Sequence, residues 1–80
     1  MSAVEALEAK RLLLQSSEEY RELVDVHHSL DSRLHELSHK PYLSDAEQLE
    51  EHTIKKRKLV VKDQMETLAR EYVRSRSIAS

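Results

Sequence analysis

The feature that most constrains this chain is its only proline, Pro41, which stands midway along a sequence that contains no glycine. Proline lacks a backbone amide and disfavours helical geometry in the residue before it, so a helix has to end near Lys40. Without glycine, tight β-hairpin turns and phosphate-cradling loops are both disfavoured. Both halves are rich in Leu, Ala, Glu, Lys, Arg and Gln, a composition typical of long helices. The sequence therefore predicts an all-α protein.

The half before Pro41 predicts a helix over about residues 17–39 that packs along its length on another helix. Apolar positions recur there at spacings of three and four, the pattern of a coiled-coil seam. The seam consists of Tyr20, Leu23, His27, Leu30, Leu34 and Leu37. Residues 16–19, Ser-Ser-Glu-Glu, have the pattern of a capping box, with Glu19 reaching back to the cap. The segment 1–16 is predicted to be helical but loosely docked, and it either continues the first helix or folds back.

The half after Pro41 predicts a second helix over about residues 45–74, followed by a frayed tail at 75–80. Residues 44–47, Ser-Asp-Ala-Glu, form another capping-box pattern with acids in the first turn. Its seam consists of Ile54, Val61 and Leu68 at heptad spacing, with Met65 and Tyr72 beside them. Because the connection at about residues 40–44 is short, we expect an antiparallel helical hairpin over residues 17–74.

A second apolar face on the later helix has no partner in this hairpin. On a helical wheel, Leu49, Leu59 and Val60 point away from Ile54 and Val61. A chain of 80 residues without cysteine also has a small core and no disulfide to support it. We therefore expect a symmetric homodimer that forms a four-helix bundle. The alternative is that the segment before residue 17 folds back over this face.

Three motifs in the chain resemble a known family. They are His-His-Ser-Leu-Asp at 27–31, Ser-Asp-Ala-Glu at 44–47 and Ile-Lys-Lys-Arg-Lys-Leu-Val-Val-Lys-Asp at 54–63. Over about residues 18–73 the chain resembles the YdcH-like family of small bacterial proteins of unknown function. Ile54 and Val61 replace leucines of the family motif, which is a conservative departure. The resemblance implies a self-associating helical hairpin in a bacterial cytoplasm, and it implies no biochemical activity.

The lysines of the third motif are a possible partner-binding site. Lys55, Lys58 and Lys62 form a stripe along the helix, Lys56 lies nearby, and Glu51 and Glu66 close the stripe at its ends. One interpretation is a solvated face with ion pairs Glu51–Lys55 and Glu66–Arg70. The other is a surface for nucleic acid or an acidic partner. A net charge of −2 and the lack of an aromatic in the stripe disfavour nucleic acid.

The histidines raise the question of a metal site. His28, His35 and His39 can share one helix face, yet no carboxylate is paired with them and no HExxH motif is present. We expect solvent-exposed histidines and no metal. His27 lies in the seam, where it is either a hydrogen-bonded, partly buried residue near Asp31 or a pH-sensitive switch.

The sequence favours a non-enzymatic, self-associating protein–protein interaction module without cofactors. A chain without cysteine or glycine-built loops, folded as a thin bundle, offers little for catalysis. No apolar run is long enough to span a membrane and the start lacks a secretory pattern, so we expect a cytoplasmic protein. The partner besides a second copy is unidentified. The alternative function is nucleic-acid association through the Lys55–Lys62 stripe.

Overall fold

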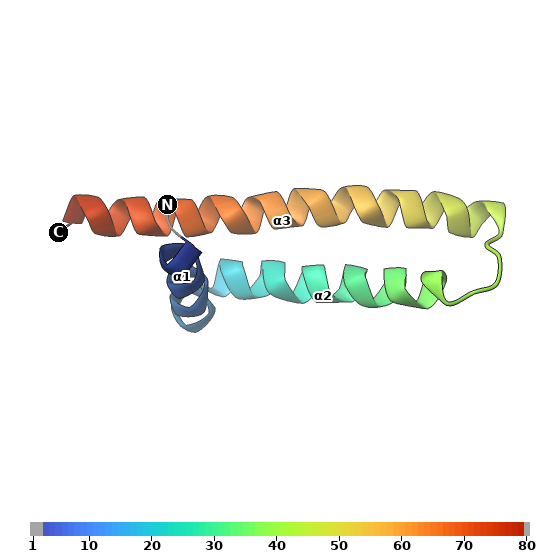
Figure 1. The fold of residues 1–80 in the computed structure, drawn as a ribbon, viewed down its shortest axis with the longest axis horizontal. Coiled ribbons are helices and arrows are strands. Elements are labelled where there is room, and N and C mark those ends of the chain that lie inside the picture. Colours follow the sequence, from blue (N-terminus) through green and yellow to red (C-terminus); the bar gives the residue numbers. More distant parts are fainter. Residues whose placement is uncertain (1–2, 80) are drawn as a thin grey trace.

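The computed structural model describes residues 3–79, and within that range it contains three helices and no strand. Helix α1 spans Ala3–Ser16, α2 spans Glu18–Ser38 and α3 spans Asp45–Ala79. Figure 1 shows α2 and α3 side by side and antiparallel, joined at one end of a molecule that measures 54 × 19 × 19 Å. The predicted all-α class is confirmed. Residues 1, 2 and 80, which belong to the predicted N-terminal segment and tail, lie outside the described residues.

A single residue, Ser17, separates α1 from α2. Its backbone is extended, with φ −115° and ψ 113°, and its hydroxyl accepts a hydrogen bond from the Tyr20 amide at 3.1 Å. Ser17 is therefore the N-cap. The predicted hydrogen bond between a serine hydroxyl and the third amide of the helix is confirmed at Ser17, while the Ser16 hydroxyl donates to the Leu12 carbonyl at 2.9 Å. The predicted return contact of Glu19 is not found among the described residues. Tyr20 occupies the third position of α2, which leaves no acid there to reach back to the cap.

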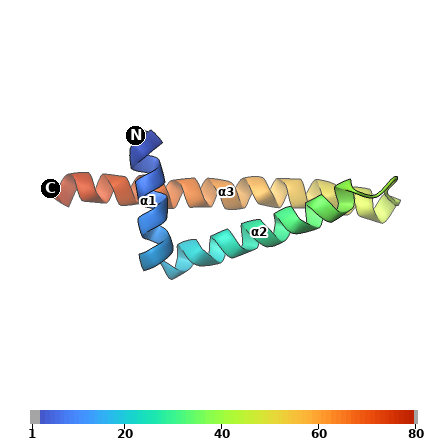
Figure 2. The same cartoon turned by 60° about the horizontal axis from the view of Figure 1, so that its bottom comes forward.

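Arg21 reinforces this corner. Its Nη1 donates to the carbonyls of Leu14 and Gln15 at 3.1 and 3.2 Å, and these groups would otherwise lack a partner in the last turn of α1. The chain consequently turns sharply, and α1 crosses α3 in Figure 2 instead of extending α2. Of the two predicted alternatives for the N-terminal segment, folding back is the one observed.

Small side chains line the crossing of α1 and α3. Ala9 and Ala69 are 2% and 0% exposed and belong to one buried cluster. Because alanine has a small side chain, α1 and α3 can approach each other closely at this point. Lys10 Nζ also donates to Glu66 Oε1 at 2.7 Å. The expectation of a loosely docked N-terminal segment is therefore corrected: α1 contributes Ala9 and Leu13 to the core.

The seam that was predicted as one continuous stripe is divided between two clusters. The first lies between α2 and α3 and contains the buried residues Leu30, Leu37, Ile54 and Val61, with Leu23, Leu34, Leu43 and Met65 packed against them. The second joins all three helices and contains Ala9, Leu13, Tyr20 and Ala69, with Val24, Met65, Leu68, Tyr72 and Val73 around them. The far end of the hairpin is thus a three-helix core, which a hairpin-only interpretation omits.

The connection between α2 and α3 follows from its sequence. Amides of His39 and Lys40 bond to carbonyls three residues back, at 3.2 Å each, and Pro41 then ends the helix. The capping box at the start of α3 is confirmed: the Glu47 amide donates to Ser44 Oγ at 3.2 Å, and the Ser44 amide donates to Glu47 Oε1 at 3.1 Å. Lys40 also pairs with Glu47.

The later helix is longer than predicted. α3 continues to Ala79, so the expected frayed tail from residue 75 is corrected over residues 75–79. α3 has 35 residues against the 21 of α2, and its last turns run past the point where α1 crosses it (Figure 1).

Candidate interaction surface

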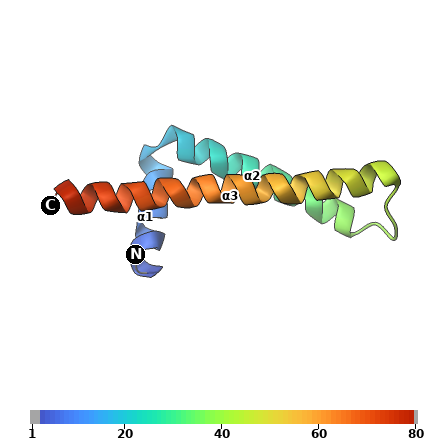
Figure 3. The same ribbon diagram turned by 90° about the horizontal axis from the view of Figure 1, so that it is seen from above.

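The side of α3 that points away from α2 is uncovered along the hairpin. Figure 3 shows α3 in front of both other helices, and Leu49, Leu59 and Val60 are 68%, 69% and 57% exposed. At 100° per residue, the exposed positions opposite Ile54 fall within an arc of about 100°. We call this surface the outer face of α3, and it consists of Asp45, Leu49, His52, Lys56, Leu59, Val60, Asp63, Arg70 and Arg74.

The alternative prediction, in which the N-terminal segment covers this face, is wrong. α1 packs against Ala69, Tyr72 and Val73 instead of reaching Leu49, Leu59 or Val60. Two large aliphatic side chains in succession, Leu59 and Val60, therefore remain in water at the middle of a helix. Adjacent exposed apolar residues of this kind mark an interaction site more often than scattered single ones do.

Helix α1 has an exposed apolar stripe that the sequence interpretation missed. Val4, Leu7 and Leu14 are 73%, 69% and 43% exposed on the side of α1 that faces away from its buried residues, Ala9 and Leu13. The sequence does contain this stripe, because Val4, Leu7 and Leu14 are spaced by three and then seven residues. It was overlooked because the same short segment carries a second set of apolar residues for the core.

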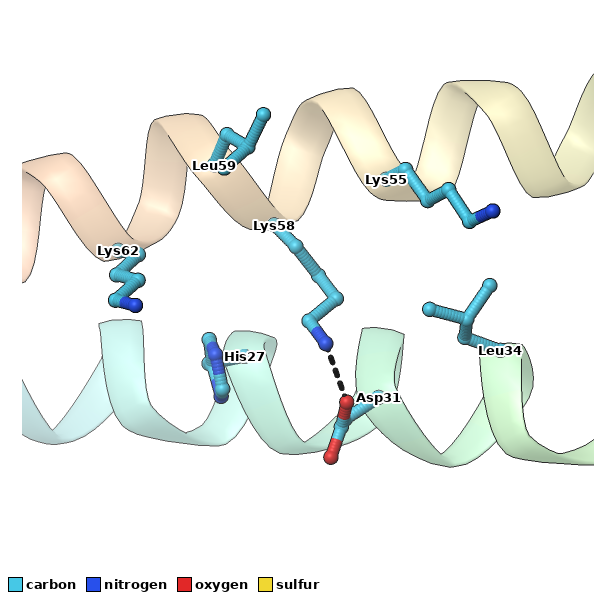
Figure 4. Close-up of a pocket in the computed structure, with 7 residues that line it drawn as sticks. All are labelled: His27, Asp31, Leu34, Lys55, Lys58, Leu59 and Lys62. Atoms are coloured by element: carbon cyan, nitrogen blue, oxygen red, sulfur yellow. Dashed lines mark hydrogen bonds and ion pairs between the residues drawn. The ribbon is translucent and has the colours of Figure 1, made fainter.

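An open groove runs between α2 and α3 beside the buried seam. Figure 4 shows its lining residues, which are His27, Asp31, Leu34, Lys55, Lys58, Leu59 and Lys62. Three of the four predicted partner-binding lysines meet there. Lys56 does not, because it lies on the outer face of α3. The outer position of Leu59 makes the groove continuous with that face.

Ion pairs neutralise part of the positive charge in this groove. Lys58 Nζ donates to Asp31 Oδ1 across the hairpin, and this hydrogen bond lowers the pKa of Asp31 below its ordinary value. Lys55 lies 3.6 Å from Glu51, as the i,i+4 spacing predicted. Asp31 therefore pairs with Lys58, and the predicted proximity of Asp31 to His27 produces no hydrogen bond between them.

A second predicted ion pair is wrong in its partner. Glu66 was expected to pair with Arg70, but it accepts a hydrogen bond from Lys10 of α1, which lowers the pKa of Glu66. Arg70 Nη2 instead donates to Thr67 Oγ1 at 3.2 Å. The i,i+4 spacing offered Glu66 a partner one turn away, and the position of α1 decides between the two cations.

Ion pairs also hold the other edge of the hairpin. Arg33 forms a bidentate pair with Glu50, with Nε and Nη2 donating at 2.8 and 2.9 Å. This pair lowers the pKa of Glu50 and raises that of Arg33. It joins α2 to α3 in the register in which Leu30 and Ile54 share one buried cluster, as the sequence predicted.

Four of the five histidines fall into two separate pairs. His35 and His39 have ring centroids 4.3 Å apart, and His39 Nδ1 lies 2.8 Å from the His35 carbonyl oxygen. His28 is instead edge-on to His27, with centroids 6.3 Å apart. Within residues 3–79, no group of three or more His, Cys, Asp or Glu side chains is placed to hold a metal ion.

One comparison with known proteins gave a match. The model of a family described as "Protein of unknown function (DUF465)" matches residues 20–69, which span most of α2, the connection and most of α3 up to the crossing with α1. No curated protein and no solved structure matches the chain. In the described part of the chain, none of the helices combines the length and apolarity that a membrane crossing requires.

Proposed function

The chain belongs to this family of proteins of unknown function, which includes the YdcH-like proteins, and we propose that it is a non-enzymatic interaction module that self-associates through the outer face of α3. Its simplest assembly is a homodimer with the four long helices of two hairpins, acting in the cytoplasm. A further protein partner would bind the same assembly.

The observation that carries this proposal is the exposure of Leu59 and Val60 beside a core that both other helices have already completed. Neither α1 nor α2 has a further apolar face directed at them. Burial of such side chains stabilises a complex by about 25 cal/mol for each Å² of apolar surface that is removed from water. A second copy presents the same residues, so an isologous contact buries the apolar area of both copies.

The electrostatics support a binding role over a catalytic one. The carboxylates with lowered pKa values, Asp31, Glu47, Glu50 and Glu66, are each held by a lysine or arginine in an ion pair that joins helices or caps one. A catalytic acid or base needs a pKa close to the working pH. The pKa values of these four carboxylates are instead lowered, away from neutral pH, by ion pairs that stabilise the fold.

Substitution of Leu59 by Asp tests the proposal. We expect sedimentation to show at least two chains for the wild type and a monomer for Leu59→Asp, with the helical circular dichroism signal largely retained. Val61→Asp is the contrasting variant: it places a charge in the buried seam, where Val61 is 7% exposed, so the hairpin should unfold. A wild-type monomer at micromolar concentration would refute self-association.

The groove favours one alternative function, nucleic-acid association through its lysines. Lys62 has no ion pair within the described residues, while Lys55 and Lys58 are partly neutralised. Binding to DNA or RNA that weakens steeply with salt, and that is abolished by Lys55→Glu with Lys62→Glu, would support this alternative. The absence of binding at low salt would eliminate it.

A further inference from the structure

Four of the five charged residues on the outer face of α3 stand in an order that is complementary to its own reverse. The fifth is Arg70, whose Nη2 donates to Thr67 Oγ1. Asp45 lies at one end and Arg74 at the other, while Lys56 and Asp63 flank the central pair Leu59 and Val60. All four charged side chains are exposed, and none takes part in an ion pair within residues 3–75. Their charges are thus available to a partner.

From this order we infer that two copies of α3 pair antiparallel, about a two-fold axis that passes between Leu59 and Val60. Lys56 of each copy then faces Asp63 of the other, and Asp45 faces Arg74. Leu59 faces Val60 at the centre. The inference rests on the proposed self-association and adds its orientation and register. Each dimer gains four ion pairs, two of each kind, around a small apolar centre.

Other registers lose this complementarity. A shift by one heptad places Lys56 on Lys56 or Asp63 on Asp63, depending on its direction. A shift by half a heptad places Lys56 against Leu59, or Asp63 against Val60. Parallel pairing in register also sets like charges against each other. Like charges across an interface are unfavourable, so one antiparallel register is selected.

The dimer also has to accommodate α1 and α2. Figure 3, seen from above, shows that neither helix lies in front of α3 along the full hairpin. Two α3 helices can therefore meet back to back without moving α1 or α2. The two hairpins would then lie on opposite sides of a central α3 pair.

Charge reversal tests the register with the full-length chain. Lys56→Glu alone and Asp63→Lys alone each place like charges together twice, and we expect each to raise the dimer dissociation constant by about tenfold or more. An equimolar mixture of the two variants restores opposite charges at both positions, so it should form heterodimers with near wild-type affinity. Lys62→Glu is the matched control, since it makes the same charge change on the groove side of α3.

Cysteine cross-linking tests the orientation, because the chain has no cysteine of its own. Val60→Cys should form an intermolecular disulfide readily. Arg74→Cys should not, because its two copies lie about 40 Å apart in the antiparallel pair at 1.5 Å per residue.

The outcomes separate this inference from the proposed function. A wild-type monomer overturns both. Three results with a dimeric wild type would overturn the register alone. They are an unchanged dissociation constant in Lys56→Glu, the absence of heterodimers in the mixture of Lys56→Glu with Asp63→Lys, and a disulfide between two Arg74→Cys chains. Selective heterodimers with cross-linking at Val60→Cys only would support it.

Discussion

At the scale of the residue, carboxylates connect the stability of this protein to pH. Glu47 accepts hydrogen bonds from the Lys40 side chain and from the Ser44 amide, and these bonds lower its pKa from an ordinary 4.5 to about 2. Asp31, Glu50 and Glu66 are shifted in the same direction by Lys58, Arg33 and Lys10. A carboxylate with a lowered folded-state pKa stabilises the fold above its unfolded pKa and loses that contribution as the pH falls.

We therefore predict that the melting temperature falls as the pH drops from about 4.5 towards 2, the window between the two pKa values of Glu47. Glu47→Gln should be less stable than the wild type at pH 7 and should lose less stability on acidification. Circular dichroism melts across this range provide the measurement. Glu22→Gln is the control, since Glu22 is exposed and has no ion pair in the described part of the chain. Parallel pH curves for Glu47→Gln and the wild type would contradict the assignment.

Single residues differ in how well the sequence predicted them. The buried positions Leu30, Leu37, Ile54 and Val61 followed from spacings of three, four and seven, since a repeating pattern identifies a helix face. The ion-pair partner of Glu66 could not be predicted from such spacing. Local spacing offered Arg70, whereas Lys10, which is distant in sequence, binds it. Ion pairs between helices depend on crossing geometry, which a local pattern does not contain.

At the scale of the element, the corner at Ser17 decides where α1 goes. Ser17 caps α2 through the Tyr20 amide, and Arg21 satisfies the last carbonyls of α1. Ser16 and Ser17 were compatible with either a continuous helix or a break, because serine is tolerated inside helices and preferred at caps. The sequence predicted both long helices of the hairpin, but the direction of α1 depended on whether Ala9 and Ala69 could pack together.

We predict that Ser17→Ala destabilises the protein by about 1 kcal/mol, the usual cost of removing an N-cap side chain. The variant should also favour continuation of α1 into α2, which would withdraw Ala9 and Leu13 from the second core. Urea denaturation measures the stability change, and hydrogen exchange in α1 reports its release. Ser32→Ala on the exposed middle of α2 should change neither. If both alanine variants behave alike, the N-cap does not hold the corner.

At the level of the whole molecule, the three helices enclose their core and leave the outer face of α3 exposed to water. α2 and α1 both pack on the inner sides of α3, so Leu49, Leu59 and Val60 stay in water. The sequence predicted this surface from the helical wheel, because residues on opposite sides of one helix cannot share a partner. It did not predict that α1 completes a three-helix core at the other end, since that depends on contacts distant in sequence.

Sedimentation equilibrium of the wild-type chain at micromolar concentration tests self-association most directly. The chain has a mass of 9.4 kDa, and we predict an apparent mass of at least twice that value, which should fall to that of one chain in Leu59→Asp. A wild-type mass equal to one chain throughout the concentration series would contradict self-association through the outer face of α3.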